Sequence, residues 1–157
     1  MKRVFFMLLV MMFVLPNLAF AITNSKLSQP QAPIYDALVG AEICSYKLLT
    51  ITVTDAKFTY SKYSDESKLT LDVVIKNDND FHYEGWLVKS VVNDWEVDDY
   101  SWFEIDGGHK RATDLVLKLK GTGIRSLDEI ESVSLTFKLA YAYLSGLSDT
   151  VTIEAVK

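Results

Sequence analysis

The stretch Lys68–Lys76, KLTLDVVIK, alternates between polar and apolar side chains, with Val74 as the one exception. Successive side chains of a β-strand point to opposite faces of the sheet, so this pattern predicts a strand with one buried and one solvated face. The residues expected on the buried face are Leu69, Leu71, Val73 and Ile75.

The segment before this strand has the same period of two, with one interruption. Apolar residues alternate with threonines over Leu49–Thr54, but after Asp55 the apolar residues Ala56 and Phe58 fall on the other parity. A β-bulge or a change of sheet near Asp55 would re-aim the side chains in this way. The polar stretch KYSDES then predicts a hairpin loop.

Further segments with strand periodicity follow toward the C-terminus, at regular spacing along the chain. The total of seven or eight strands predicts an all-β protein, an antiparallel two-sheet sandwich. Asp106–Gly108 is expected to form a tight hairpin turn, because glycine readily supplies positive φ angles. The Ser-x-x-Glu spacing of Ser126–Glu129 predicts one short helical turn. The later strands are expected at Tyr83–Val97, Arg111–Lys120, Val133–Tyr141 and Thr150–Glu154.

The first 21 residues have the three features of a secretory signal peptide. Lys2 and Arg3 precede an apolar run from Val4 to Leu15, and Ala19-Phe20-Ala21 offers small residues at a cleavage site. The apolar run is too short to cross a bilayer, which takes roughly 20 residues. The expected organisation is a signal peptide over residues 1–21, a linker and N-terminal strap over 22–45, and a sandwich domain over 46–157. Within the strap, residues 34–43 fit either a helical turn or two or an irregular segment over the end of the sandwich.

Charge, apolar runs and cysteine content limit the kinds of partner and the cellular location expected for this chain. The formal net charge is −5 and becomes more negative when Lys2 and Arg3 are removed, which argues against a nucleic-acid partner. The mature chain has no second long apolar run to anchor it in a bilayer, so it is expected to be secreted, periplasmic or at the cell surface. The single cysteine, Cys44, fits either a small, partly buried side chain or a bridge between molecules, and the sequence does not fix the oligomeric state.

The order of several short motifs suggests a family. A strand ends in IKND, a later one carries VVNDWEV, and FEIDGGHK and GIRSLDEIESVSLTF follow. Over Ile51 to Ala155 this order resembles the immunoglobulin-like β-sandwich modules of bacterial, mostly Gram-positive, secreted and cell-surface proteins. GGHK departs from the family's pattern, because His109 stands where glycine directly precedes lysine. The resemblance implies an immunoglobulin-like fold and a non-catalytic binding or spacer domain without an assigned ligand.

The sequence offers little for catalysis or for metal binding. His82 and His109 lie in turn-like sequence, and the chain contains no Gly-x-Ser-x-Gly nucleophile motif. The two histidines and Cys44 lack the spacing of zinc ligands. We therefore expect no enzymatic activity, no cofactor and no metal centre, although a loose calcium site near Asp78 and Asp80 stays open.

The three tryptophans are the main candidates for a binding surface. In a continuous strand, Trp95 shares parity with Leu87 and Val91 and is expected in the core. Trp86, Tyr100 and Trp102 are the candidate ligand-binding residues, with Trp102 the better candidate for the surface. The other interpretation, favoured by the large area that a tryptophan buries, is that these rings pack between the two sheets.

The sequence thus predicts an exported, non-catalytic binding or structural module of the bacterial envelope or extracellular space, with a protein or glycan partner. A carbohydrate-binding protein that uses the exposed aromatic residues is the first alternative. An envelope enzyme or an enzyme inhibitor is the second. Exposed coplanar aromatic rings would favour sugar binding, whereas a pocket that encloses a histidine and a carboxylate would favour an enzyme.

Export can be tested directly. If the signal peptide is cleaved after Ala21, mass spectrometry of the secreted protein should give an N-terminus at Ile22. Recovery of an intact, membrane-bound chain would contradict the prediction.

Overall fold

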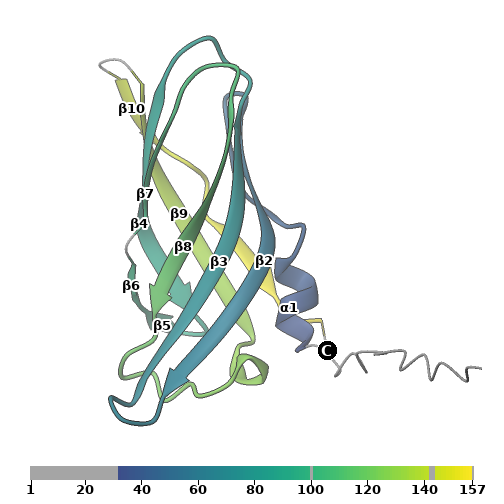
Figure 1. The fold of residues 1–157 in the computed structure, drawn as a ribbon, viewed down its shortest axis with the longest axis vertical. Helices are drawn as coiled ribbons and strands as arrows, with labels where there is room; N and C mark the ends of the chain where they lie inside the picture. Colours follow the sequence, from purple (N-terminus) through teal and green to yellow (C-terminus); the bar gives the residue numbers. More distant parts are fainter. Residues whose placement is uncertain (1–31, 100, 142–143, 157) are drawn as a thin grey trace, which may run out of the picture.

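The computed structural model describes residues 32–99, 101–141 and 144–156. The expected signal peptide, residues 1–21, lies outside these ranges. The described chain is almost entirely β, with two curled antiparallel sheets (Figure 1). Among the described residues, no helix is both long and apolar enough to cross a membrane.

The first sheet has the strand order β1-β2-β3-β8-β6, and the second has β10-β9-β4-β5, with β11 paired to β9 and β7 paired to β4. The described residues form eleven strands, of which β5 and β6 have two residues each, so the expected count of seven or eight is not confirmed. The first sheet contains β1 (Glu42–Tyr46), β2 (Leu49–Ser61), β3 (Glu66–Asn77), β6 (Asp98–Asp99) and β8 (Lys110–Lys118). The second contains β4 (Tyr83–Val92), β5 (Trp95–Glu96), β7 (Trp102–Ile105), β9 (Ser132–Tyr141), β10 (Leu144–Leu147) and β11 (Val151–Glu154).

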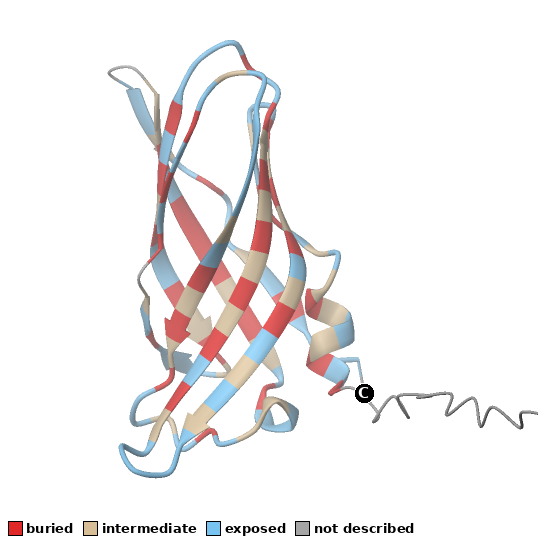
Figure 2. Cartoon of the chain, viewed as in Figure 1, coloured by how far each residue is buried: buried red, intermediate tan, exposed pale blue. Residues whose placement is uncertain are grey.

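The core lies between the sheets, where buried and exposed residues alternate along the strands (Figure 2). The register of β2 against β3 shifts between Val53 and Asp55, which confirms the expected bulge. Ala56 is buried after the shift, as the change of parity predicts. The predicted buried face of β3 is confirmed for Leu69, Leu71, Val73 and Ile75.

The segment 34–43 contains a helix rather than an irregular strap. Helix α1 (Pro33–Leu38) begins with a proline, which suits the first helical turn, and it buries Ile34 and Leu38 completely. Cys44 follows in β1 and is also buried, and this burial raises the pKa of its thiol to about 12. Residues before position 46 therefore contribute to the core.

The glycine turn connects the two sheets. β7 belongs to the second sheet and β8 to the first, so the expected hairpin is wrong, and Gly107 and Gly108 carry the chain from one sheet to the other. Gly108 has φ 71°, as a glycine turn requires. A Cβ on Gly107 would lie 2.5 Å from the backbone carbon of Asp80, so glycine is needed there for close approach.

A second crossover, from β3 to β4, lies beside the first, and one side chain joins them. Asn77 is fully buried, and its Nδ2 donates to the carbonyl oxygens of Phe81 at 2.8 Å and Asp106 at 3.2 Å. Its Oδ1 accepts the backbone N–H of Asn79 at 3.1 Å. The backbone N–H of Gly108 donates to the carbonyl oxygen of Asn79 at 2.9 Å. The stretch Asn77–Asp80 is thus structural at its two asparagines.

The expected strand over Tyr83–Val97 is interrupted, and the prediction of a core Trp95 is wrong. The register of β4 against β9 shifts between Leu87 and Lys89, so Leu87 and Val92 are both buried although their parities differ. The strand ends at Val92, and a tight turn containing Asn93, with φ 53°, leads into β5. Trp95 lies just after this turn, and its side chain is 53% exposed.

The role of Asn77 can be measured. Asn77→Ala leaves several buried backbone groups without partners, and each such group costs about 1–3 kcal/mol. We expect the free energy of unfolding to fall by about 3 kcal/mol out of a total of about 5–15 kcal/mol. Urea denaturation measures the change, with Asp80→Ala as the control because the Asp80 side chain is exposed. Equal denaturation midpoints for the two variants would contradict the role.

Candidate functional site

The outer face of the second sheet carries a ladder of paired side chains on β4 and β7. Trp86 lies directly opposite Trp102, and Glu84 lies directly opposite Glu104. Directly opposite residues of an antiparallel pair point to the same face, with Cβ atoms about 4.5–5.5 Å apart. Beyond the strand ends, Nδ1 of His82 lies 2.8 Å from Oδ1 of Asp106. We call the six residues His82, Glu84, Trp86, Trp102, Glu104 and Asp106 the β4–β7 ladder.

The structure brings two of the three candidate binding residues together. Trp102 is 51% exposed and its neighbour Trp86 is half-buried. The third candidate, Tyr100, lies outside the described residues. The prediction that Trp102 lies at the surface is confirmed, whereas its pairing with Trp86 was not visible in the sequence.

The tryptophan pair extends into a row across the sheet. Lys138 of β9 pairs with Trp86 on the other side, and its Nζ lies 5.9 Å from the centre of the Trp86 ring. Leu147 of β10 pairs with Lys138 and is 63% exposed. A mixed aromatic, aliphatic and cationic strip therefore crosses four strands on the solvent side.

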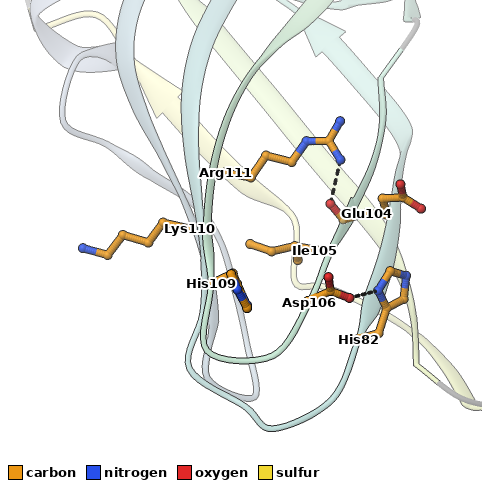
Figure 3. A pocket seen from close by; sticks show the side chains of 7 residues that line it. All are labelled: His82, Glu104, Ile105, Asp106, His109, Lys110 and Arg111. Atoms are coloured by element: carbon orange, nitrogen blue, oxygen red, sulfur yellow. Dashed lines mark hydrogen bonds and ion pairs between the residues drawn. The ribbon is translucent and has the colours of Figure 1, made fainter.

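His82 and Asp106 border a pocket of about 420 Å³ (Figure 3). The hydrogen bond from His82 is the main cause that lowers the pKa of the Asp106 carboxyl. His109 is held separately, with its Nδ1 2.7 Å from the carbonyl oxygen of Gly107. The sequence identified both histidines as turn residues but missed the His82–Asp106 contact, because it forms between the two crossovers. The lining residues are His82, Glu104, Ile105, Asp106, His109, Lys110 and Arg111.

This pocket brings charged side chains together. No serine, threonine or cysteine is among its described lining residues. The side chains of His82 and Asp106 are 44% and 76% exposed, so their contact is solvated. Among the described residues, which include Asp78 and Asp80, no group of three or more His, Cys, Asp or Glu side chains could hold a metal ion.

An aromatic cluster lies beside the same end of the ladder. The rings of Phe81 and Tyr141 stack with their centres 4.9 Å apart, and both line a second pocket of about 370 Å³ together with His82 and Glu84. Lys47 donates from Nζ to the hydroxyl of Tyr141 at 2.6 Å. This contact is the main cause that raises the pKa of Lys47.

Tyr83 lies at the centre of this cluster and is fully buried. Its ring centre is 5.4 Å from that of Phe81 and 5.3 Å from that of Tyr141. Its hydroxyl is buried without a hydrogen-bond partner in the described part of the chain. Burial is the main cause that raises the pKa of this hydroxyl.

Comparisons with known proteins give no family. Neither a scan against models of protein families nor a search among curated proteins finds a match. Among solved structures, the chain is similar to a FixG-related protein from Vibrio parahaemolyticus, with 13% identity over 71% of this chain and 100% of that chain. The TM-score is 0.34.

The unpaired hydroxyl predicts a stabilising substitution. Tyr83→Phe removes a buried polar group that costs about 1–3 kcal/mol when unsatisfied, while the ring contacts stay in place. We expect the free energy of unfolding to rise by about 1 kcal/mol, measured in urea. Tyr35→Phe serves as the control, because the Tyr35 hydroxyl donates to Asp55 Oδ1 at 2.8 Å, and its loss should not stabilise the fold. A destabilised Tyr83→Phe protein would contradict the interpretation.

Proposed function

We propose that this chain is an exported, non-catalytic binding module of the bacterial envelope or extracellular space. The observation that carries the proposal is the direct pairing of Trp86 with Trp102 on the solvent side of the second sheet. Export is supported by the signal-peptide features of residues 1–21. The motif order over Ile51 to Ala155 supports an immunoglobulin-like class for the sandwich.

Exposed tryptophans favour binding over a purely structural role. A tryptophan carries a large apolar surface, and most of its contribution to stability comes from removing that surface from water. Trp102 leaves half of this surface exposed, so it contributes less to folding than a core ring would. Tryptophan is also enriched among the residues that dominate protein–protein binding energies. This face is therefore suited to binding a protein partner.

A glycan is the alternative ligand for the same face. A pair of neighbouring rings offers a platform on which sugar rings can stack, and the carboxylates of Glu84 and Glu104 can accept hydrogen bonds from hydroxyl groups. This alternative uses the same tryptophans, so substitution of a tryptophan should weaken glycan binding as it should weaken binding of a protein partner.

The pocket of His82 and Asp106 favours an enzyme as a further alternative, because a histidine beside a carboxylate can act in acid–base chemistry. Nucleophilic catalysis also needs a nucleophile within hydrogen-bond reach of the base. The described lining contains no serine, threonine or cysteine, and the His82–Asp106 contact is open to water. We therefore propose a binding role for this end of the sandwich as well.

Two tryptophans of nearly equal exposure provide a matched test. Trp102 is 51% exposed on the ladder, and Trp95 is 53% exposed after the turn that follows β4. We expect Trp102→Ala to reduce retention of the purified protein on native envelope fractions at least tenfold, as removal of a binding hot spot does. Trp95→Ala should leave retention unchanged.

The urea denaturation midpoints of the two variants decide whether a loss of retention reflects binding or unfolding. Both residues are exposed, so both midpoints should stay close to that of the unmodified chain. Unchanged retention of Trp102→Ala, or an equal loss in Trp95→Ala, would show that the ladder is not the binding surface.

A further inference from the structure

The second rung of the β4–β7 ladder is a pair of like charges. Glu84 and Glu104 lie directly opposite each other, and both are exposed. Like charges in this arrangement destabilise a sheet. In the described part of the chain, neither carboxylate has an ion pair or a hydrogen bond. The guanidinium of Arg111 approaches this rung, but it donates to the backbone carbonyl oxygen of Glu104 (Figure 3).

The first sheet contains a similar pair of opposed carboxylates, but there a lysine compensates the charge. Asp55 of β2 lies opposite Asp72 of β3, and Lys57 follows two residues after Asp55 on β2, opposite Thr70. The Nζ of Lys57 is 3.6 Å from Asp55 and 2.5 Å from Asp72, so a cation supplied by the same sheet compensates both carboxylates. Among the described residues, no lysine or arginine forms an ion pair with Glu84 or Glu104, so this rung is complementary to a cation from outside.

The neighbouring rung adds a second preference for a cation. The face of an indole ring attracts ammonium and guanidinium groups more strongly than the other aromatic side chains do. Lys138 already lies 5.9 Å from the centre of the Trp86 ring. Trp102 is half-exposed beside it. Glu84 and Trp86 are two residues apart on β4, which places them about 7 Å apart along the strand, within the reach of one long basic side chain.

We propose that the β4–β7 ladder binds a lysine- or arginine-bearing segment of a partner protein, with the basic side chain over the tryptophan pair and its charge at Glu84 and Glu104. This inference rests on the proposed binding function and names the chemistry of its ligand. A neutral glycan could stack on the same rings, but it would leave the like-charge pair uncompensated. The formal net charge of −5 adds a long-range attraction for a basic partner.

The test uses blocked hexalysine as the probe and follows its binding to the mature chain by isothermal titration calorimetry at low salt. Hexalysine acetylated on every side chain is the uncharged control, and cellohexaose represents a neutral glycan. We expect hexalysine to bind, the acetylated peptide and cellohexaose to bind at least tenfold more weakly, and added salt to weaken hexalysine binding.

Two substitutions that each remove one negative charge distinguish binding at the ladder from attraction to the acidic chain as a whole. Glu104→Gln removes one carboxylate of the rung, and we expect roughly tenfold weaker hexalysine binding. Asp114→Asn is the matched control, since Asp114 lies opposite Asp72 in the first sheet, is exposed, and has no tryptophan pair beside it. It should leave hexalysine binding unchanged. Both substitutions relieve a like-charge pair, so neither should lower the denaturation midpoint.

Three results would overturn the inference: equal binding of the two peptides, no binding of hexalysine, or equal weakening by Glu104→Gln and Asp114→Asn. Binding of cellohexaose alone would assign the ladder to a glycan. Retention of the variants on native envelope fractions distinguishes an error in the proposed ligand from failure of the proposed binding function. If Trp102→Ala loses retention while Glu104→Gln keeps it, the binding function stands and the cationic ligand is wrong. If neither variant loses retention, the proposed function itself fails.

Discussion

The side-chain amide of Asn77 joins two connections at one end of the sandwich, where the chain passes from one sheet to the other between β3 and β4 and between β7 and β8. No backbone hydrogen bonds between strands connect the two layers of a sandwich, so the crossovers help to determine the relative position of the layers. Asn77 uses its Nδ2 on the carbonyl oxygens of both crossover segments and its Oδ1 on the N–H of Asn79. The start of β4 and the end of β7 are thereby held together, and their register places Trp86 opposite Trp102. The proposed binding face thus depends on a buried amide at the end of the sheet.

Local periodicity predicts much of this fold, and the two bulges show where it fails. The bulge near Asp55 was predictable because the apolar residues change parity visibly, from Val53 to Ala56. The bulge after Leu87 leaves no such sign, since the following valines are apolar on both parities. An uninterrupted strand therefore fitted the sequence equally well and placed Trp95 in the core. The pairing with β9 determines the parity there, and pairing is not a local property.

Trp86 and Trp102 were predicted as candidate binding residues, but their arrangement and the part played by Glu84, Glu104 and Asp106 were not. The strand period placed Trp102 on the face opposite Phe103 and Ile105, and the structure shows that Trp102 is exposed on this face. The pairing of Trp102 with Trp86 and the contact of His82 with Asp106 both require that β7 lie beside β4. Gly107 and Gly108 instead suggested that β7 pairs with the strand after the turn, because a glycine turn more often joins two strands of one sheet. The tight approach of Gly107 to the β3–β4 loop, which decides between these arrangements, involves backbone atoms distant in sequence.

Protection of the sheet edge is an alternative explanation for the acidic rung. β7 pairs with β4 on one side, and an exposed aromatic edge strand invites association with other chains. Its charge at Glu104 and the bond from Arg111 to the Glu104 carbonyl oxygen both discourage such pairing. Edge protection does not account for Glu84, because β4 is paired on both sides, with β9 and with β7. A lysine at position 84 would leave the protection by Glu104 in place and would also form a favourable pair with Glu104. Protection of the edge therefore does not explain a second glutamate on an inner strand, at a cost to stability, whereas the proposed recognition of a cation does.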